Sequence, residues 1–517
     1  MKFIELLTSK GTVTPLVLVI VGSWVTYSIL TVLYNLSRFH PLSRIPGPLL
    51  ARATILPEFY YDFIKYGRYT HVIKRMHEKY GPIVRISPNE VHCNDINFVD
   101  EIYSLGGRKR NKTQHYVNCT AIALSEFATV EHDLHRTRRA PVVRFFSRGM
   151  ITKLESHIHD LVHILCDKLL SSVHEPVDLV VAYSCFSSDA ISAYCFGETF
   201  GFMEREGWFS DFHTAELEIL RPVYVFRFFP FFRQFARYGK YFVDYLPKEI
   251  ALLIRTLRID VPNKILKTKQ ELDAGVYRDR PTIFSSLLSD PKRKKELDLV
   301  DEAGILLGAG TETTAWFFVV VTYHLLNKPE LLERLHKELS QAVEDPRNLP
   351  TWSALESLPY LNAVVREGLR LSYGVPTRSA RVPVHEDLIY RGNWKGEPVK
   401  YVIPRGYGIG MSNGITHHDE SVFPDSYSFI PERWFDEKNR KQLDRGLVAF
   451  SKGARACLGM NLAYCEIYVG LAALVLRVLP KMKLFETTVK DVQWDYDMII
   501  PMPSRDSKGM RVTISPD

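Results

Sequence analysis

The sequence has few cysteines, and no two of them are spaced as a CxxC pair. The seven are Cys93, Cys119, Cys166, Cys185, Cys195, Cys457 and Cys465. An odd number without paired spacing is not typical of a disulfide framework. We therefore expect the folded part of the chain to lie in a reducing compartment.

Long runs of one charge sign and internal repeats are also missing. The formal net charge is +7, and no Lys/Arg-rich run typical of nucleic-acid-binding proteins occurs. We therefore expect no nucleic-acid partner. With 517 residues, 46% of them apolar, the composition is that of a globular protein whose core can enclose a bulky cofactor.

Charged residues are absent from the segment 11–37. An α-helix crosses a bilayer with about 20 largely apolar residues, whereas a cleaved signal peptide has an apolar region of roughly 7–15. The length favours a retained transmembrane helix at about 13–34, within an anchor of residues 1–40. The body would span residues 41–517, after a stiff connector with three prolines at 40–48.

The body has mostly helical periodicity. Apolar spacing predicts helices near 151–172, 296–326, 358–371 and 457–478, and short strands near 83–93, 376–404 and 482–515. The longest helix should end at Asn327, because Lys328 and Pro329 follow. The expected fold class is mainly α with small β-sheets.

The segment 224–242 has an unusual composition. It contains ten aromatic residues and four cationic ones, but no acid. Aromatic and cationic side chains together suit a membrane interface or a ligand entrance beside it. An aromatic-rich pair of core helices is an equally good interpretation.

The segment 450–459, FSKGARACLG, has the strongest chemical signal. Cys457 opens an apolar helix, whose N-terminal dipole and free N–H groups favour a thiolate. A thiolate is a strong ligand for haem iron. Gly453 and Gly459 permit close approach of the backbone to a flat macrocycle, and Arg455 is placed to reach a propionate.

This segment resembles the haem-binding signature of the cytochrome P-450 family, FxxGxRxCxG. Many members have a second glycine where this chain has Ser451. The resemblance implies a mostly helical domain that holds haem b, with the Cys457 thiolate on the iron. The matching residues are Phe450, Gly453, Arg455, Cys457 and Gly459.

Two further motifs occur in the order that this family has. Glu367 and Arg370 are at i and i+3 on one helix, so their side chains can meet. Pro431-Glu432-Arg433-Trp434 follows them. By resemblance, Glu367, Arg370 and Arg433 form a buried triad that braces the cysteine loop.

The middle of the longest helix has the sequence AGTETT at 309–314. One interpretation is merely a kinked core helix, because glycine and threonine weaken a helix interior. The resemblance implies the oxygen-activation segment, in which Gly310 opens a notch for dioxygen. Thr313 and Glu312 would then deliver protons to the distal haem face.

Three basic residues match the family's propionate ligands. His135 and Arg139 are four residues apart, so both can reach one carboxylate, and Arg381 matches a further ligand. A solvated face is the alternative. Arg138 and Lys452 are the candidates for docking an acidic partner.

The resemblance implies a monooxygenase that uses O2. Electrons would come from NADPH through a separate reductase, possibly with cytochrome b5, because no flavin or nicotinamide segment occurs. It also implies a single-pass protein of the endoplasmic reticulum with its catalytic domain in the cytosol. A haem-thiolate isomerase or dehydratase, and a haem sensor, are the rival interpretations.

The substrate is the least defined part. Segments that line the pocket in the family are largely apolar here, namely 111–125, 374–377 and 498–501, which predicts a lipophilic small molecule. The segments 450–453, 461–464 and 417–420 are similar to fungal trichodiene-oxygenase-like enzymes of secondary metabolism. This favours a terpenoid and leaves polyketides and alkaloids open.

Overall fold

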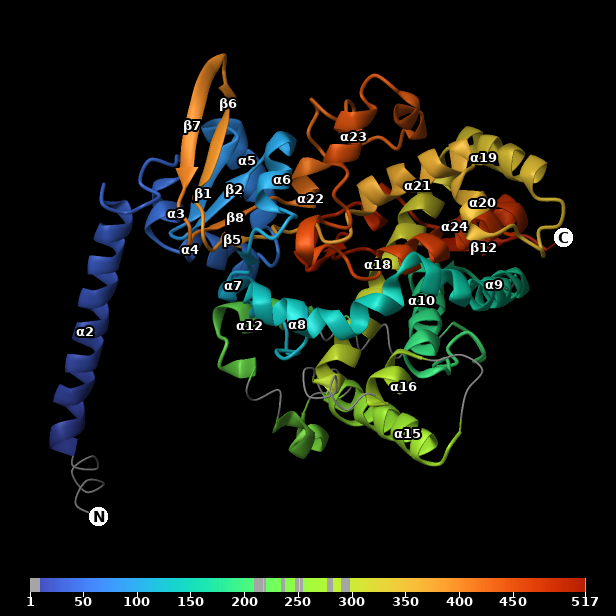
Figure 1. Ribbon diagram of the computed structural model, residues 1–517, viewed down its shortest axis with the longest axis horizontal. Helices are drawn as coiled ribbons and strands as arrows, with labels where there is room; N and C mark the ends of the chain where they lie inside the picture. Colours follow the sequence, from blue (N-terminus) through green and yellow to red (C-terminus); the bar gives the residue numbers. More distant parts are fainter. Residues whose placement is uncertain are drawn as a thin grey trace.

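The computed structural model describes residues 10–516 except 174, 209–216, 218–219, 234–237, 247–250, 252–253, 277–281 and 290–297. The body is mainly helical, with small sheets on both sides of it (Figure 1). The long helices are α2 (Lys10–Leu36), α9 (Arg148–Ser171), α10 (Leu179–Phe196), α18 (Leu299–Asn327), α21 (Pro359–Ser372) and α24 (Met460–Arg477). The expected fold class is therefore confirmed.

Shorter helices complete the body. Those used below are α3 (Leu49–Ala53), α4 (Leu56–Glu58), the π-helix η1 (Phe59–Ile64), α5 (Tyr69–Tyr80), α7 (Gln114–Val117), α8 (His132–Val143), α12 (Val223–Phe228), α15 (Val261–Asp273), α16 (Ile283–Leu288) and α19 (Pro329–Ala342). As expected, α18 ends at Asn327, and Pro329 begins α19.

In the described part of the chain, the strands form five small sheets. One has the order β1-β2-β8 (Ile83–Ser87, Glu90–Cys93, Gly408–Gly410), and another β4-β12-β9 (Val177–Asp178, Arg511–Ile514, Met482–Leu484). The rest are pairs: β3-β5 (Arg110–Asn111, Val382–Pro383), β6-β7 (Leu388–Trp394, Glu397–Ile403) and β10-β11 (Tyr496–Met498, Ile500–Met502). The predicted strand regions are confirmed.

Helix α18 is the centre of the main core. Helices α10, α21 and α24 pack against it, and their apolar side chains form one cluster. Close packing with α21 depends on Gly368, because a Cβ there would lie 2.6 Å from Cε2 of Phe317. Such a distance is far below van der Waals contact, so only glycine fits without rearrangement.

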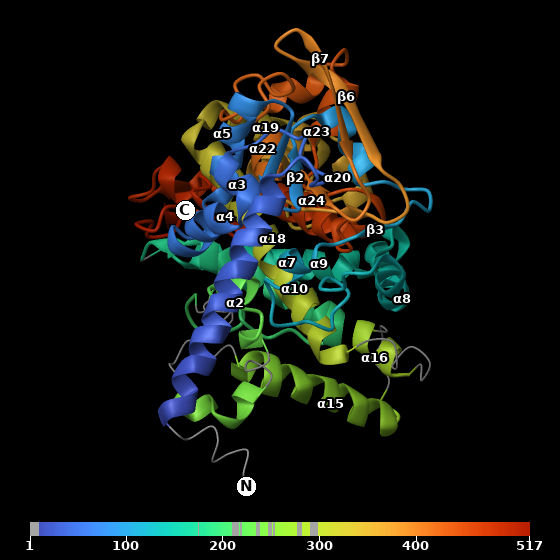
Figure 2. The same ribbon diagram turned by 90° about the vertical axis from the view of Figure 1, so that its left-hand side faces the viewer.

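Helix α2 stands apart from this core. It leaves the body beside α3 and extends away from it (Figures 1 and 2). An 18-residue window within Val17–Leu36 has a mean hydropathy of 1.9 and contains no buried residue, whereas the apolar helices α10, α18 and α24 are largely buried. Val17–Leu36 is thus a candidate membrane span.

The aromatic segment divides into buried and exposed parts. Tyr224 and Phe226 are buried, as the core interpretation requires. Other rings are exposed, as an interface requires: Phe231, Phe232, Tyr238, Tyr241 and Phe242. Phe235 and Arg237 lie outside the described residues.

We predict that Gly368→Ala lowers the free energy of unfolding by about 1–3 kcal/mol, since the added methyl group overpacks the α18–α21 contact. Gly149→Ala is the control, because nothing lies within 4 Å of a Cβ at that helical position. It should be neutral or stabilise by up to about 1 kcal/mol. Urea unfolding of the purified holoenzymes measures both, and equal effects would refute the packing argument.

Candidate active site

The loop before α24 holds Cys457 in a closed turn. The Cys457 amide donates to the Phe450 carbonyl oxygen at 2.9 Å. Ser451 lies in the left-handed region with φ 56°, which explains why glycine is favoured at this position. Gly453 has φ 76°, and a Cβ there would collide with the backbone of Tyr103. Gly453 therefore packs closely against protein on this side, and the approach of its backbone to a macrocycle stays a prediction.

Cys457 is set deep in the protein but remains accessible. It is exposed, whereas the other six cysteines are buried. Burial raises the pKa of its thiol, while a hydrogen bond from the Gly459 amide and the charge of Arg139 lower it. The sulfur is both accessible and surrounded by protein if it borders an interior space. Nothing lies within 4 Å of a Cβ built on Gly459, so this side of the loop has room for a ligand.

Helix α18 also has an accessible surface in its middle. Ala309 is exposed and Thr313 is half-buried, although α18 is otherwise a core helix. The Thr313 hydroxyl donates to the Ala309 carbonyl oxygen at 2.8 Å. Its own oxygen thus remains an acceptor at this surface.

The two neighbours of this surface face α10 instead. Glu312 accepts a hydrogen bond from Ser184 at 3.3 Å and is buried. A Cβ on Gly310 would lie 2.8 Å from Cγ1 of Ile191. The described geometry thus gives Gly310 a packing role, and Thr313 and Glu312 diverge because adjacent helix residues are about 100° apart. Their joint proton relay stays a prediction.

His135 and Arg139 do share a carboxylate, and it is that of Glu126. His135 Nε2 and Arg139 Nη1 lie 2.5 and 2.9 Å from Glu126 Oε1. Arg139 Nη2 also donates to the Ala456 carbonyl oxygen at 2.9 Å, next to Cys457. Burial disfavours the charged carboxylate, but the bond from His135 and the charges of His135 and Arg139 lower the pKa of Glu126 to about 2.

Several buried cations surround this carboxylate. Arg455 donates to the carbonyl oxygens of Thr129 and Val130 at 2.6 and 2.7 Å. Arg381 donates to Ser379 and Ala380. Burial and the charge of Arg381 lower the pKa of Arg455 to about 9, and the same two causes lower the pKa of Lys112 to about 7.

These residues fit a haem. The described cluster has the cationic residues Lys112, Arg139, Arg381 and Arg455 around one acid, Glu126, so positive charge is in excess. Two haem propionates would offset that excess. Helix α24 begins at Met460, so Cys457 lies three residues before the helix and does not open it as predicted. An accessible sulfur to which an amide donates is still a suitable ligand for the iron.

The predicted triad is confirmed. Arg370 donates to both oxygens of Glu367 at 2.8 and 3.0 Å, and Arg433 Nε donates at 3.1 Å. Trp434 Nε1 adds a further bond at 3.0 Å. Glu367 and Arg370 are fully buried. Burial opposes the charge, but Arg370 and Arg433 hold the pKa of Glu367 below its ordinary value.

His417 connects the triad to the cysteine loop. Its Nδ1 donates to the Arg370 carbonyl oxygen at 2.7 Å, and its Nε2 accepts from the Val448 amide at 3.0 Å. Burial lowers the pKa of His417 to about 3, which keeps the ring neutral for both bonds. Val448 precedes Phe450, so the brace ends at the loop that holds Cys457.

Three residues of this site were not predicted from the sequence: Lys112, Glu126 and His417. A local sequence pattern could have identified Lys112, because it is a cation within a largely apolar segment. No local sequence pattern identifies Glu126 or His417, because their partners are distant in sequence. Arg138 is half-buried and donates to Thr129, so it serves the interior more than a docking surface.

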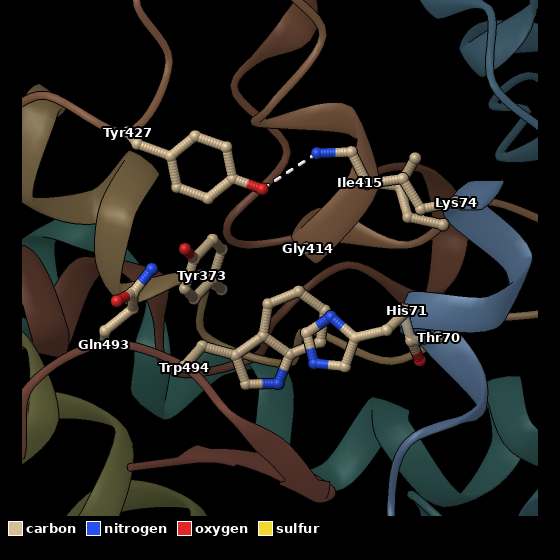
Figure 3. A pocket seen from close by; sticks show the side chains of 9 residues that line it. All are labelled: Thr70, His71, Lys74, Tyr373, Gly414, Ile415, Tyr427, Gln493 and Trp494. Atoms are coloured by element: carbon tan, nitrogen blue, oxygen red, sulfur yellow. Dashed lines mark hydrogen bonds between the residues drawn. The ribbon is translucent and has the colours of Figure 1, made fainter. Parts of the chain in front are cut away.

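A separate pocket lies away from these residues. It has a volume of about 220 Å³ and is lined by aromatic and polar side chains, among them His71, Lys74, Tyr427 and Trp494 (Figure 3). None of the predicted site residues lines it.

Comparison with known proteins agrees with the family resemblance of the cysteine loop. The family model described as cytochrome P-450 matches residues 57–492. The cytochrome P-450 monooxygenase ppzE of Metarhizium majus is 38% identical over 84% of this chain and 95% of its own. A conidiogenone synthase of Penicillium rubens is 36% identical over 94% and 96%, and the N-acetyltryptophan 6-hydroxylase ivoC of Emericella nidulans is 34% identical over 95% and 97%.

We predict that Glu126→Gln destabilises the holoenzyme more at pH 7 than at pH 3. The pKa of Glu126 falls from its ordinary 4.5 to about 2 on folding. Its ionised form therefore stabilises the fold fully above about pH 4.5, and this contribution is lost as pH falls towards 2. Urea unfolding of the variant and the wild type at both pH values measures the difference.

The matched control is Glu78→Gln, because Glu78 is exposed on α5. It should have little effect at either pH. An equal loss of stability for Glu126→Gln at pH 7 and pH 3 would contradict the charged role of Glu126.

We predict that His417→Phe lowers the fraction of enzyme with a thiolate-type carbon monoxide spectrum. The variant leaves the Arg370 carbonyl and the Val448 amide unpaired in the interior, at a cost of about 1–3 kcal/mol each. The exposed His385 is the control, and His385→Phe should keep the wild-type spectrum. An unchanged spectrum in His417→Phe would remove His417 from the brace.

Proposed function

The chain belongs to the cytochrome P-450 family and is a monooxygenase with a haem-thiolate cofactor, and from this premise we propose that it hydroxylates or epoxidises a lipophilic secondary metabolite, a terpenoid. The observation that carries the proposal is the accessible Cys457 beside the buried cation cluster. Oxygen would come from O2, and electrons from NADPH through a separate reductase.

Each residue near the haem has a role in this proposal. When bound, the haem supplies oxygen activation. Cys457 would hold the iron, with the Gly459 amide tuning the sulfur. Arg381, Arg455 and Lys112 would hold the propionates. Arg139 would couple them to the loop, because it already bonds Ala456 and Glu126.

Thr313 would hold a proton donor at the distal face. Its hydroxyl is back-bonded to Ala309, so its oxygen can accept a bond from a water molecule at the accessible surface of α18. Glu312 would exchange protons with this region only after its side chain leaves Ser184. A proton relay that includes Glu312 would therefore require its side chain to move away from Ser184.

The substrate proposal has a second candidate. The chain's relatives are fungal monooxygenases of secondary metabolite pathways, and one of them is named a conidiogenone synthase. Another is named an N-acetyltryptophan 6-hydroxylase. An aromatic, amino-acid-derived substrate is therefore the alternative to a terpenoid, and the apolar segments that border the pocket suit either.

We also propose that the enzyme is anchored in the endoplasmic reticulum, with its domain in the cytosol. The exposed apolar span Val17–Leu36 supports the anchor. Further exposed apolar side chains border α3 to η1 and the segment after α12. The rings of Phe59 and Phe63 pack against those of Phe228 and Phe229, which joins the two areas into one surface. Such a surface suits a membrane interface.

We predict NADPH-dependent oxygenation when the full chain is expressed with a fungal cytochrome reductase and offered terpene, polyketide and indole scaffolds. Thr313→Ala should lower product formed per NADPH by about 100-fold, the lower end of the range for a positioned proton donor. Metabolite profiling with NADPH consumption measures this ratio. Thr311→Ala is the matched control, since the Thr311 hydroxyl faces α10.

Cys457→Ser tests the premise of the site. We expect it to abolish both the thiolate-type carbon monoxide spectrum and turnover, because serine does not supply a thiolate. Turnover that needs neither NADPH nor O2 would favour the isomerase or dehydratase interpretation. A preserved thiolate spectrum in Cys457→Ser would refute the assignment of the iron ligand.

A further inference from the structure

A groove separates the anchor helix from the body. Its volume is about 490 Å³. On one side it is lined by α2, and on the other by α3 to α4, the β1–β2 turn and α7. The residues from α2 are Tyr27, Ser28, Thr31, Val32 and Asn35.

The anchor is fixed to the body where the groove closes. Asn35 Nδ2 donates to the Ala53 carbonyl oxygen at 2.9 Å, and Arg85 Nη1 donates to the Asn35 carbonyl oxygen at 3.1 Å. Asn35 and Arg85 are both buried. These bonds set the direction in which α2 leaves the body, so the groove is a defined part of the fold.

The face of α2 towards the groove is more polar than its other side. Tyr27, Thr31 and Asn35 are spaced by four residues, so they share one face. The hydroxyls of Ser28 and Thr31 donate to the carbonyl oxygens of Trp24 and Tyr27 at 2.8 Å. Their oxygens are thereby left as acceptors. The far side carries exposed apolar residues, among them Ile29, Leu30 and Leu33.

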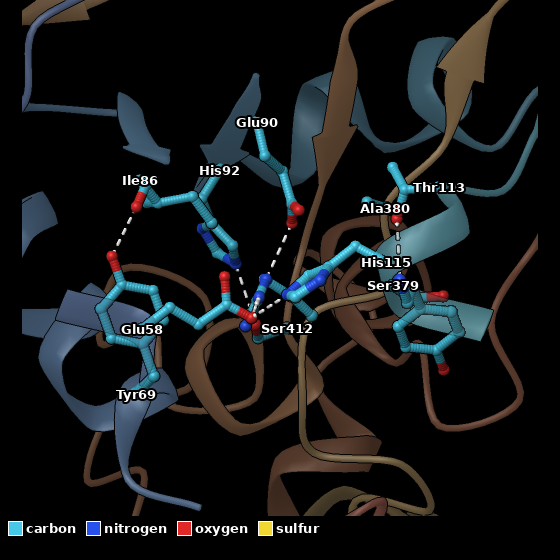
Figure 4. Close-up of polar contacts among 12 residues, drawn as sticks. Glu58, Tyr69, Ile86, Glu90, His92, Thr113, His115, Ser379, Ala380 and Ser412 are labelled. Carbon is cyan, nitrogen blue, oxygen red and sulfur yellow. Dashed lines mark hydrogen bonds and ion pairs between the residues drawn. The ribbon is translucent and has the colours of Figure 1, made fainter. Parts of the chain in front are cut away.

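The body contributes carboxylates to the groove. Glu58 and Glu90 both line it, and Arg378 bonds to both, with Nε lying 2.8 Å from Glu90 Oε1 (Figure 4). His115 Nε2 lies 2.8 Å from Glu58 Oε1. The Glu58 side chain is 1% exposed. Although burial opposes ionisation, Arg378 and His115 hold its pKa far below the ordinary value.

Carboxylate and amide oxygens without a donor line the groove, together with the hydroxyls of Tyr27, Ser87 and Thr113, which can donate or accept. Among the described residues, both hydrogen bonds to Glu58 reach Oε1, so Oε2 has no donor, and Glu90 Oε2 has none either. Asn35 Nδ2 is used, which leaves its Oδ1. No Lys or Arg lines the groove in the described part of the chain. The site therefore favours a ligand that donates hydrogen bonds and disfavours an anion.

The groove also lies at the right depth for an amphiphile. A helix rises 1.5 Å per residue, so Val17–Leu36 spans about 30 Å, the thickness of a bilayer core. The stretch from Tyr27 to Asn35 covers about 12 Å of it, at the end next to the body. A ligand head in the groove would lie near the interface, with its chain in the hydrocarbon.

We propose that this groove binds a membrane amphiphile by its uncharged hydroxyl head. Glu58, Glu90 and Asn35 accept the hydrogen bonds of the head, and the chain extends along α2 into the bilayer. The site is separate from Cys457 and would collect hydroxylated lipophiles beside the enzyme. It rests on the membrane anchoring that we propose above.

The experiment uses the full-length holoenzyme in phosphatidylcholine vesicles. One probe is a long-chain alcohol with a photoreactive diazirine near its head, and the other is the matched sulfate ester, which is always anionic. We expect the alcohol to label residues 24–36 and 113–118 at least about fivefold more than the sulfate. Mass spectrometry of the digested protein measures the labelling.

Two variants test the groove itself. Thr31→Phe fills it and should lower labelling by the alcohol about fivefold or more. Ile29→Phe adds the same bulk on the far side of α2 and should label as the wild type. Equal labelling by both probes, unchanged labelling in Thr31→Phe, or no labelling by the alcohol would each overturn the inference.

Flotation of the vesicles and the carbon monoxide spectrum are measured on the same samples. Protein that does not float would refute the membrane anchoring itself. Protein that floats with an intact spectrum, but fails the labelling test, refutes only the groove.

Discussion

The structure around Cys457, the proposed iron ligand, depends on one buried ion pair, that between Glu367 and Arg370. Two opposite charges without access to water are stable only when each lone pair and each N–H group has a partner. Arg370 therefore also bonds the carbonyl oxygens of His417, Ser426 and Ser428. The irregular segment 417–434 is thereby fixed, and His417 passes this constraint to Val448 and the cysteine loop.

A second constraint is the charge balance beside Cys457. Lys112, Arg381 and Arg455 are held close together in the interior. Burial lowers the pKa of all three, and repulsion by Arg381 further lowers the pKa of Lys112 and of Arg455. Glu126 alone among the cluster's described residues opposes them directly. Such an arrangement is unfavourable by itself and becomes favourable with an anionic partner, which is what a haem with two propionates provides. The cofactor thus completes the electrostatics as well as the chemistry.

The part of the molecule near the anchor has a different distribution of polar and apolar groups. In the proposed anchoring, the apolar anchor and the exposed rings would face lipid, while the groove between anchor and body holds carboxylate and amide oxygens. In the proposed binding mode, the polar acceptors of the groove would select what lies beside the enzyme, and the residues near Cys457 would act on the substrate. Access and chemistry are thus governed by separate parts of the molecule.

Local periodicity and short spacings within one helix or loop were enough to predict the long helices and the Glu367–Arg370 pair, and to propose Cys457 as the iron ligand. Only the tertiary structure decided that His135 and Arg139 meet Glu126, that Gly310 packs on Ile191, and that Gly453 packs on Tyr103. It also decided the link through His417 and the groove beside α2. These contacts join segments distant in sequence, and no local pattern encodes which partner a side chain will meet.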